Sequence, residues 1–246
     1  MIITIDGIKT NYCRLGSGKK TVLFLHGWHQ NYGFEKYQKL LDCLSKKFTV
    51  IALDLPGFGQ TDLNPILWTV FDYADFVAKF ITNLKLKSFT LTGHSFGGRL
   101  SLILSTHPLI SPLVSNLILI DSAGIEIKSL KTKIILRLSR ITPSFLKKIL
   151  SPFFSSSDYS TLSGVKKQSF SLVVSQDLSH LLPDINLPTL LLWGGLDRLT
   201  PLAHAHIFHQ NIKNSKLVIS ESDNHGLPYR NHSFVCRQIT KFLDHQ

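Results

Sequence analysis

The chain has 246 residues, 43% hydrophobic and 17% charged, a balance typical of a globular protein with one large α/β domain. Its apolar runs fall short of the ~18–20 residues of a membrane-spanning helix, and its first residues lack the basic flank and cleavage site of a signal peptide. The net charge of +11 is compatible with a nucleic-acid partner, but no aromatic-basic binding module accompanies it, so none is expected.

The cysteine and histidine spacings predict neither a disulfide nor a metal site. Cys13, Cys43 and Cys236 lie far apart and form no Cys-x-x-Cys pair, so we expect free thiols and a cytoplasmic protein. The His204-x-His206 pair falls in a predicted helix, where residues two apart diverge around the axis. No metal or other cofactor is therefore expected.

Apolar strands alternate with helix-period segments along most of the chain. This alternation predicts an α/β fold with a mostly parallel eight-stranded sheet flanked by helices. Hairpin turns are expected at Asp6–Gly7 and at 16–20. The expected strands are 1–5, 10–15, 21–25, 48–53, 88–92, 116–120, 187–193 and 216–219. The expected helices are 34–46, 70–84, a segment from Gly97 to about 107, 202–210 and 233–244.

The segment 125–185 interrupts this alternation and divides the chain into a core, 1–124 and 186–246, and an insertion after the sixth strand. Between 125 and 180 nine cations accompany three anions, on amphipathic stretches broken by prolines. We expect a helical cap whose apolar stripe covers a pocket and whose lysines face solvent. The alternative is that the basic face docks on an anionic membrane or attracts acidic substrates.

A Gly-x-Ser-x-Gly motif, Gly93-His94-Ser95-Phe96-Gly97, stands between a predicted strand and a predicted helix. In that setting the motif predicts a strained turn that lifts the serine side chain clear of the sheet. The flanking glycines are needed because a Cβ there would strike the neighbouring strand or helix. The motif makes Ser95 a candidate nucleophile.

Other polar residues follow other predicted strands, and the carboxyl ends of parallel strands form one edge of a sheet. The residues at these ends are His26, Asp54, Ser95, Asp121, Asp197 and His225. A serine nucleophile needs a histidine base held by a carboxylate. His225, in an open loop, is the leading base, with His232 as the alternative. Asp197 is the leading acid, with Asp121 as the alternative.

Acyl transfer also needs donors for the developing oxyanion. We expect these to be the backbone N–H groups of Phe96, at a helix N-terminus, and of Trp28, in the turn after the third strand. His26 is expected to hold that turn by hydrogen bonds, and His94 to be a packing residue. The expected apolar acyl pocket is formed by Trp28, Phe96, Phe145, Phe153 and Phe154.

Taken together, these motifs resemble the α/β-hydrolase superfamily, and most closely its compact esterases with a helical cap. The matching residues are His26-Gly27-Trp28, Asp54-Leu55-Pro56-Gly57-Phe58-Gly59, Gly93 to Gly98, Trp193-Gly194-Gly195-Leu196-Asp197 and His225. The resemblance implies the α/β-hydrolase fold, a catalytic triad of Ser95, Asp197 and His225, and an oxyanion hole at Trp28 and Phe96. One departure is Asn224, where relatives usually have glycine.

These features predict a serine hydrolase that cleaves a small-molecule carboxylic ester through an acyl-enzyme. A serine at the turn disfavours the epoxide hydrolases and haloalkane dehalogenases of the superfamily, which use aspartate there. A lactonase or a carbon–carbon bond hydrolase with the same three residues is the alternative. An alternative of another class is a non-catalytic binding protein that uses the fold alone. The oligomeric state is left open.

Overall fold

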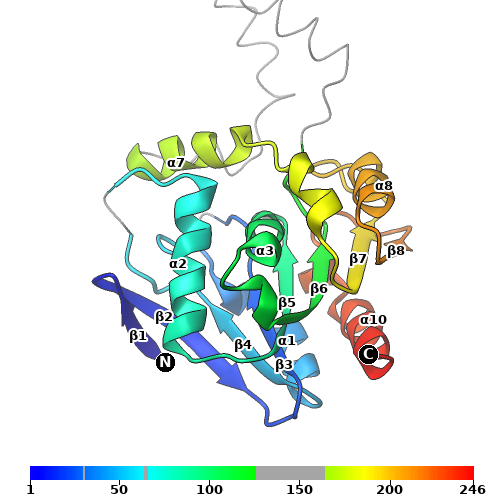
Figure 1. Cartoon of the computed structure of the whole chain (residues 1–246), viewed down its shortest axis with the longest axis horizontal. Coiled ribbons are helices and arrows are strands. Elements are labelled where there is room, and N and C mark those ends of the chain that lie inside the picture. The colour runs from blue at the N-terminus through cyan, green and yellow to red at the C-terminus, as the bar shows by residue number, and fades with distance from the viewer. Residues whose placement is uncertain (30, 64–65, 126–163) are drawn as a thin grey trace, which may run out of the picture.

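An eight-stranded sheet forms the centre of the protein in the computed structural model, which describes residues 1–29, 31–63, 66–125 and 164–246 (Figure 1). The strand order is β1-β2-β4-β3-β5-β6-β7-β8. Every neighbouring pair from β4 to β8 is parallel, and β2 alone runs antiparallel to its two neighbours, β1 and β4, so the predicted mostly parallel sheet is confirmed. The strands are β1 Ile2–Ile5, β2 Ile8–Leu15, β3 Thr21–Leu25, β4 Thr49–Leu53, β5 Phe89–His94, β6 Val114–Ile120, β7 Thr189–Gly194 and β8 Ser215–Ser220.

Helices cover both faces of the sheet and enclose two separate cores. On one face α2, α3 and α8 pack against alternate strand residues such as Leu23 and Leu91. On the other face α1 and α10 pack against the intervening residues, such as Val22 and Phe24. The helices are η1 Phe34–Tyr37, α1 Gln38–Ser45, α2 Val70–Asn83, α3 Phe96–Thr106, η2 Ser111–Leu113, α7 Gly164–Ser175, η4 Ser179–Asp184, α8 Leu202–Asn211, α9 Leu227–Arg230 and α10 His232–Asp244.

The first predicted hairpin is confirmed and the second is wrong. Asp6 and Gly7 both have positive φ, 49° and 79°, as the tight turn between the paired strands β1 and β2 requires. The segment 16–20 has turn residues as well, but it joins β2 to β3, which are not neighbours. Instead β4 lies between them, antiparallel to β2 and parallel to β3. Strand pairing is a long-range choice that local turn chemistry does not reveal.

Most predicted elements are present, with ends that differ by one or two residues. The fifth strand continues through Gly93 and His94, because these residues pair with the end of β6. The first helix begins as the 3₁₀ segment η1 rather than as α-helix. The four-residue helix α9 is too short to show a periodic pattern and was not predicted.

The predicted cap at 125–185 falls largely outside the described residues, as do Phe145, Phe153 and Phe154, so the cap stays a prediction. The described part of this segment contains α7 and η4. Figure 1 shows α7 lying across the end of the molecule at which α2 begins. Within the described ranges, no helix combines the length and apolar character needed to cross a bilayer.

The expectation of three free thiols is wrong. Cys43 of α1 and Cys236 of α10 form a disulfide with an S–S distance of 2.10 Å and a Cα–Cα distance of 6.2 Å, and Cys13 is free. The two residues are 193 apart in sequence, and they meet only because α1 and α10 pack together on one face of the sheet. The cytoplasmic location rested on free thiols, so it loses that support.

The disulfide can be tested by thiol counting and by substitution. Denatured protein purified without reductant should expose one reactive thiol, that of Cys13, and three reactive thiols would contradict the pairing. The double variant Cys43→Ser/Cys236→Ser should lose about 2–5 kcal/mol of unfolding free energy in urea, because the bridge closes a long loop in the unfolded chain. The control Cys13→Ser, which breaks no covalent bond, should change it by less than about 1 kcal/mol.

Candidate active site

Ser95 lies at the sharp turn between β5 and α3, and its backbone is strained. Its φ is 52° and its ψ is −108°, outside the regions that non-glycine residues ordinarily adopt. The turn is possible because a Cβ at Gly97 would lie 2.1 Å from the carbonyl oxygen of Leu25, so only glycine fits. Backbone bonds hold the turn: the N–H of Ser95 donates to Ile120, and its carbonyl accepts from Ala123. The predicted strand–turn–helix geometry is therefore present.

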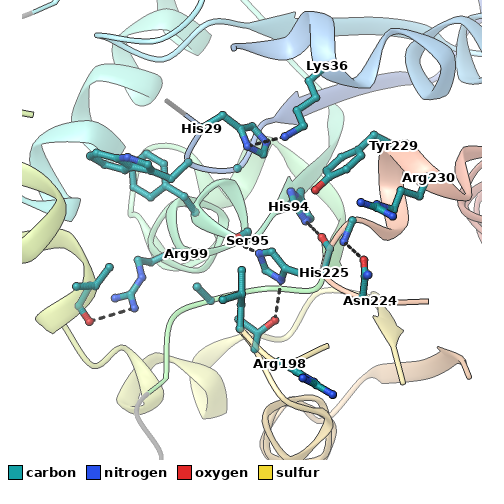
Figure 2. Close-up of a pocket in the computed structure, with 18 of the residues that line it drawn as sticks. His29, Lys36, His94, Ser95, Arg99, Arg198, Asn224, His225, Tyr229 and Arg230 are labelled. Carbon is teal, nitrogen blue, oxygen red and sulfur yellow. Dashed lines mark hydrogen bonds between the residues drawn. The ribbon is translucent and has the colours of Figure 1, made fainter. Parts of the chain in front are cut away.

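The structure brings Ser95, His225 and Asp197 together from three separate segments. Figure 2 shows the side chains of Ser95 and His225 facing each other. The distance from Ser95 Oγ to His225 Nε2 is 2.9 Å, and from His225 Nδ1 to Asp197 Oδ2 it is 2.7 Å. Because a carboxylate only accepts, Nδ1 carries the proton of a neutral imidazole. Nε2 is then the acceptor for the Ser95 hydroxyl, the arrangement that a general base requires.

Asp197 is fixed by the loop that follows β7. Its Oδ1 accepts from the backbone N–H groups of Leu199 and Thr200, at 2.7 and 3.0 Å, and its Oδ2 accepts from the Thr200 hydroxyl at 2.6 Å. Burial favours the neutral acid, but the bonds from His225 and Thr200 outweigh it and lower the pKa of Asp197. The carboxylate is therefore ionised at neutral pH and points at the imidazole.

The alternative acid, Asp121, is fully buried and does not bond to His225. Its Oδ1 accepts from the N–H of Gly194 at 2.7 Å, and its Oδ2 has no hydrogen-bond partner among the described residues. Burial raises the pKa of Asp121 to about 8, although the Gly194 bond acts in the opposite direction. Asp121 is thus a largely neutral group below the site, and His232, the alternative base, begins α10 instead.

A second set of hydrogen bonds supports the backbone of His225. His94 Nε2 lies 2.9 Å from the His225 carbonyl oxygen, and His94 Nδ1 lies 2.7 Å from the Tyr37 hydroxyl. That hydroxyl also contacts His29 Nε2 at 2.7 Å and accepts from the Gly27 N–H at 3.0 Å. Lys36 Nζ lies 3.1 Å from His29 Nδ1. These residues join the loop after β3 to the loop that carries His225.

The donors and acceptors in this set can be assigned in only one direction. The His225 carbonyl only accepts, so His94 donates from Nε2 and accepts at Nδ1 from the Tyr37 hydroxyl. The Tyr37 oxygen then accepts from His29 Nε2–H, which leaves His29 Nδ1 to accept from the Lys36 ammonium. Burial favours neutral rings: it lowers the pKa of His29 to about 2, with help from Lys36, and places the pKa of His94 well below 6.5.

His26 and Asp54 order the loops beside the site rather than lining it. His26 Nε2 accepts from the Leu55 N–H at 3.0 Å, so Nδ1 carries the proton and donates to the Gly27 carbonyl at 2.7 Å. Burial lowers the pKa of His26 to about 4, which keeps it neutral. The Asp54 carboxylate accepts from the N–H of Phe34 and from two further donors, Asn11 and Gln60. The structural role expected for His26 is confirmed.

Ser95 and His225 open into a cavity of about 800 Å³. Trp28 and Phe96, expected to form the pocket, line it, and the rings of Phe96 and Phe170 pack edge-on against Trp28. Phe96 is the first residue of α3, where backbone N–H groups have no partner within the helix. Asn224, the departure from the family pattern, accepts from the Gly226 N–H at 3.0 Å and so braces the loop.

His94, Asp121 and His225 place possible metal-ligand atoms within 4.8 Å of one another. Both ring nitrogens of His94 are already bonded, to Tyr37 and to the His225 carbonyl. Those of His225 are bonded to Ser95 and Asp197. A metal ion would have to replace these bonds, so hydrogen bonding accounts for the cluster.

The sequence interpretation missed Tyr37, His29, Lys36 and Thr200. Tyr37 falls within the predicted helix 34–46, and a tyrosine among the apolar residues of a helix is ordinarily a core residue. Its ring is indeed buried, and only the meeting of η1 with β5 reveals what its hydroxyl bonds. Thr200 follows Asp197 closely enough for a carboxylate-bracing turn to be suspected, but its hydroxyl bond to Oδ2 needs the folded loop.

Replacement of Tyr37 tests the hydrogen-bonded set. Tyr37→Phe retains the ring but leaves the donors of Gly27 and His29 and the acceptor of His94 without a partner, so we expect a loss of about 1–3 kcal/mol in urea denaturation. Tyr73→Phe is a matched control, because the buried Tyr73 hydroxyl makes one long bond of 3.4 Å, to Pro56. Equal losses in the two variants would contradict the role given to the Tyr37 hydroxyl.

Replacement of Asp121 tests its raised pKa. Between its ordinary value of 3.8 and about 8, the folded protein retains a proton that the unfolded chain has released. This group therefore makes stability fall as pH rises through that window. Asp121→Asn should remove this pH dependence. Above pH 8 the free energy of unfolding of the variant should exceed that of wild type by roughly 1 kcal/mol or more. Urea denaturation from pH 5 to 9 measures the difference, and parallel curves for the two proteins would refute it.

Comparison with known proteins places this geometry in a family. The profile of the alpha/beta hydrolase fold family matches residues 20–158, and that of the TAP-like proteins matches residues 168–245. The chain is 26% identical to the uncharacterized hydrolase YugF of Bacillus subtilis, over 98% of this chain and 96% of that one. It is 25% identical to a pimeloyl-[acyl-carrier protein] methyl ester esterase of Wigglesworthia glossinidia brevipalpis, over 93% of this chain and 95% of that one.

A shorter match and two solved structures complete the comparison. The chain is 39% identical over 38% of its length to an acetyltransferase component of the acetoin cleaving system of Cupriavidus necator, of which the match spans 25%. A thermophilic esterase from Thermogutta terrifontis has a TM-score of 0.75 and 22% identity, covering 99% of this chain and 98% of that one. An enol-lactonase from Burkholderia xenovorans has a TM-score of 0.75 and 16% identity, and the match covers 99% of this chain and 100% of that one. The chain belongs to the alpha/beta hydrolase fold family.

Proposed function

We propose that this protein is a serine hydrolase that cleaves carboxylic esters through an acyl-enzyme. The observation that carries the proposal is the hydrogen-bonded series Ser95–His225–Asp197, which opens into a cavity at the carboxyl edge of the sheet. A weak hydroxyl nucleophile, a neutral imidazole with its acceptor nitrogen on that hydroxyl, and an ionised carboxylate behind the imidazole are the parts that acyl transfer needs.

In the proposed mechanism Ser95 Oγ attacks the ester carbonyl carbon while His225 Nε2 takes its proton. Asp197 stabilises the imidazolium that forms. The backbone N–H groups of Trp28 and Phe96 donate to the oxyanion of the tetrahedral intermediate. The alcohol leaves with the proton from His225. Water, deprotonated by the same nitrogen, then attacks the acyl-enzyme and releases the acid and Ser95.

Two considerations favour esters over the other bonds that such a site attacks. The full-length relative named as a methyl ester esterase suggests ester chemistry, although at 25% identity it does not specify the acyl group. The apolar rings of Trp28, Phe96 and Phe170 beside Ser95 suit an acyl chain. A lactonase or carbon–carbon hydrolase would use the same three residues, so lactones and vinylogous diketones belong in the assay panel. The solved enol-lactonase shares the fold, which by itself does not choose between these substrates.

Labelling by a fluorophosphonate and steady-state hydrolysis of short-chain and medium-chain esters test the proposal. Wild type should be labelled at Ser95, and Ser95→Ala should not be. Ser95→Ala and His225→Gln should each lower kcat by more than about 10³-fold, and Asp197→Asn by on the order of 10³–10⁴-fold. Asp121→Asn serves as the matched carboxylate control and should retain activity within a few-fold.

The outcomes separate the candidate functions. Labelling with lactone turnover but no ester turnover would replace the esterase by a lactonase. No labelling of folded wild type, or equal labelling of Ser95→Ala, would overturn the enzyme and leave a binding protein.

A further inference from the structure

The cavity around Ser95 has two chemically different walls. One wall is built by the loop after β3, η1 and α9, and it carries His29, Lys36, Tyr229 and Arg230. Figure 2 shows Lys36, Tyr229 and Arg230 together on the same side of Ser95 and His225. The opposite wall comes from α7 and the loop after β7 and is mainly apolar. Its members are Phe170, Val173, Val174, Leu196 and Leu199.

Local contacts hold the two cations of the first wall beside the His225 loop. Lys36 Nζ lies 3.1 Å from His29 Nδ1 and 4.6 Å from the centre of the Tyr229 ring. The Arg230 side chain folds back over the loop: a Cβ placed on Gly226 would lie 2.8 Å from Arg230 Cδ and 2.9 Å from its Nε. Gly226 directly follows His225, so the Arg230 side chain packs against the loop that carries His225 and lines the same cavity.

The charge at this end of the cavity is positive. The cavity lining contains Lys36, Arg99, Arg198 and Arg230 and, within the described part of the chain, no aspartate or glutamate. Two acids nearby in sequence are engaged elsewhere: Glu35 accepts from the Gly33 N–H, and Asp223 accepts from Ser220 and Asn231.

The remaining acid at the site, Asp197, is bonded to His225, and none of the ion pairs formed by the described residues involves Arg230 or Arg198. Arg99, the most buried of the four, donates to the carbonyl oxygens of Gln176 and Val174 at the end of α7. Lys36 and Arg230 both line the cavity on the side of the His225 loop. Cationic side chains beside an aromatic ring suit an anionic group with several oxygens, such as a planar carboxylate or a tetrahedral phosphate.

We propose that Lys36 and Arg230 bind an anionic group, a carboxylate or a phosphate, carried by the ester on one side of its scissile bond. The apolar wall receives the other side. This inference rests on the ester hydrolysis proposed above and names the substrate class. Substrates of this class are monoanionic or dianionic esters with an apolar portion, rather than neutral esters.

Matched pairs of substrates test the inference. The first pair is the monomethyl ester of a dicarboxylic acid and the same ester with a neutral primary amide in place of the free carboxylate. The second pair consists of two butanoate esters, one with a carboxylate in its alcohol portion and one with a neutral amide at the same position. A third compound carries a phosphate monoester in place of the carboxylate and separates the two kinds of anion. In the pair whose anion lies on the side of the ester that reaches Lys36 and Arg230, kcat/KM should be about tenfold higher for the anionic ester than for its amide. Added salt should reduce this preference.

Variants assign the preference to the two cations. Lys36→Gln and Arg230→Gln should each reduce the ratio of kcat/KM for the anionic ester to kcat/KM for its amide about three- to tenfold. Arg230→Lys keeps the charge and should keep most of the preference. Lys39→Gln removes a lysine that lies in α1 and does not line the cavity, so it controls for a change in net charge.

Binding to an inactive variant keeps this inference distinguishable from the proposed function. In Ser95→Ala, calorimetry should show tighter binding of the anionic ester than of its amide, and loss of that difference when Lys36→Gln and Arg230→Gln are added. Turnover of neutral esters with no anion preference in any pair would overturn the anion site and leave the esterase intact. Selective binding without any turnover would support the anion site and overturn the esterase.

Discussion

The close approach of α3 to the end of β3 is the constraint on which the rest of the site depends. With a Cβ at Gly97 only 2.1 Å from the Leu25 carbonyl, this crossing admits glycine alone. The approach forces Ser95 to a φ of 52° and lifts its side chain above the sheet. The same crossing places the N-terminus of α3 beside the loop after β3. The strain at Ser95 is held by a packed sheet on both sides, which is how such a conformation persists.

Two sets of hydrogen bonds meet at His225: one orients its ring and the other holds its backbone. Asp197 bonds the ring and determines which nitrogen carries the proton. His94 bonds the backbone carbonyl and, through Tyr37, ties the His225 loop to Gly27 next to Trp28. In a low-dielectric interior such a series of hydrogen bonds is stable only when every donor and acceptor in it has a partner, and here each donor has an acceptor. The proposed base and one proposed oxyanion donor are thereby held by one network.

The residues that surround the proposed catalytic groups also separate charge from apolar surface. Histidines 26, 29 and 94 are all buried, and burial keeps them neutral, so the positive charge near the site resides in lysine and arginine side chains at the cavity wall. The disulfide between α1 and α10 braces the helical layer against which η1 and α9 also pack. The layer that carries the charged wall of the cavity is thus the one that the disulfide stabilises.

The sequence by itself determined the alternation of strands and helices, the serine turn, and the strand-end positions of Asp197 and His225, because each depends on local periodicity or on a short motif. It did not determine that β4 separates β2 from β3, that Cys43 meets Cys236, or that Tyr37 reaches His94. It also left Asp121 and Asp197 as alternatives. Only the tertiary structure decided these points, because each depends on which distant segments pack together, and local patterns carry no information about such long-range pairing.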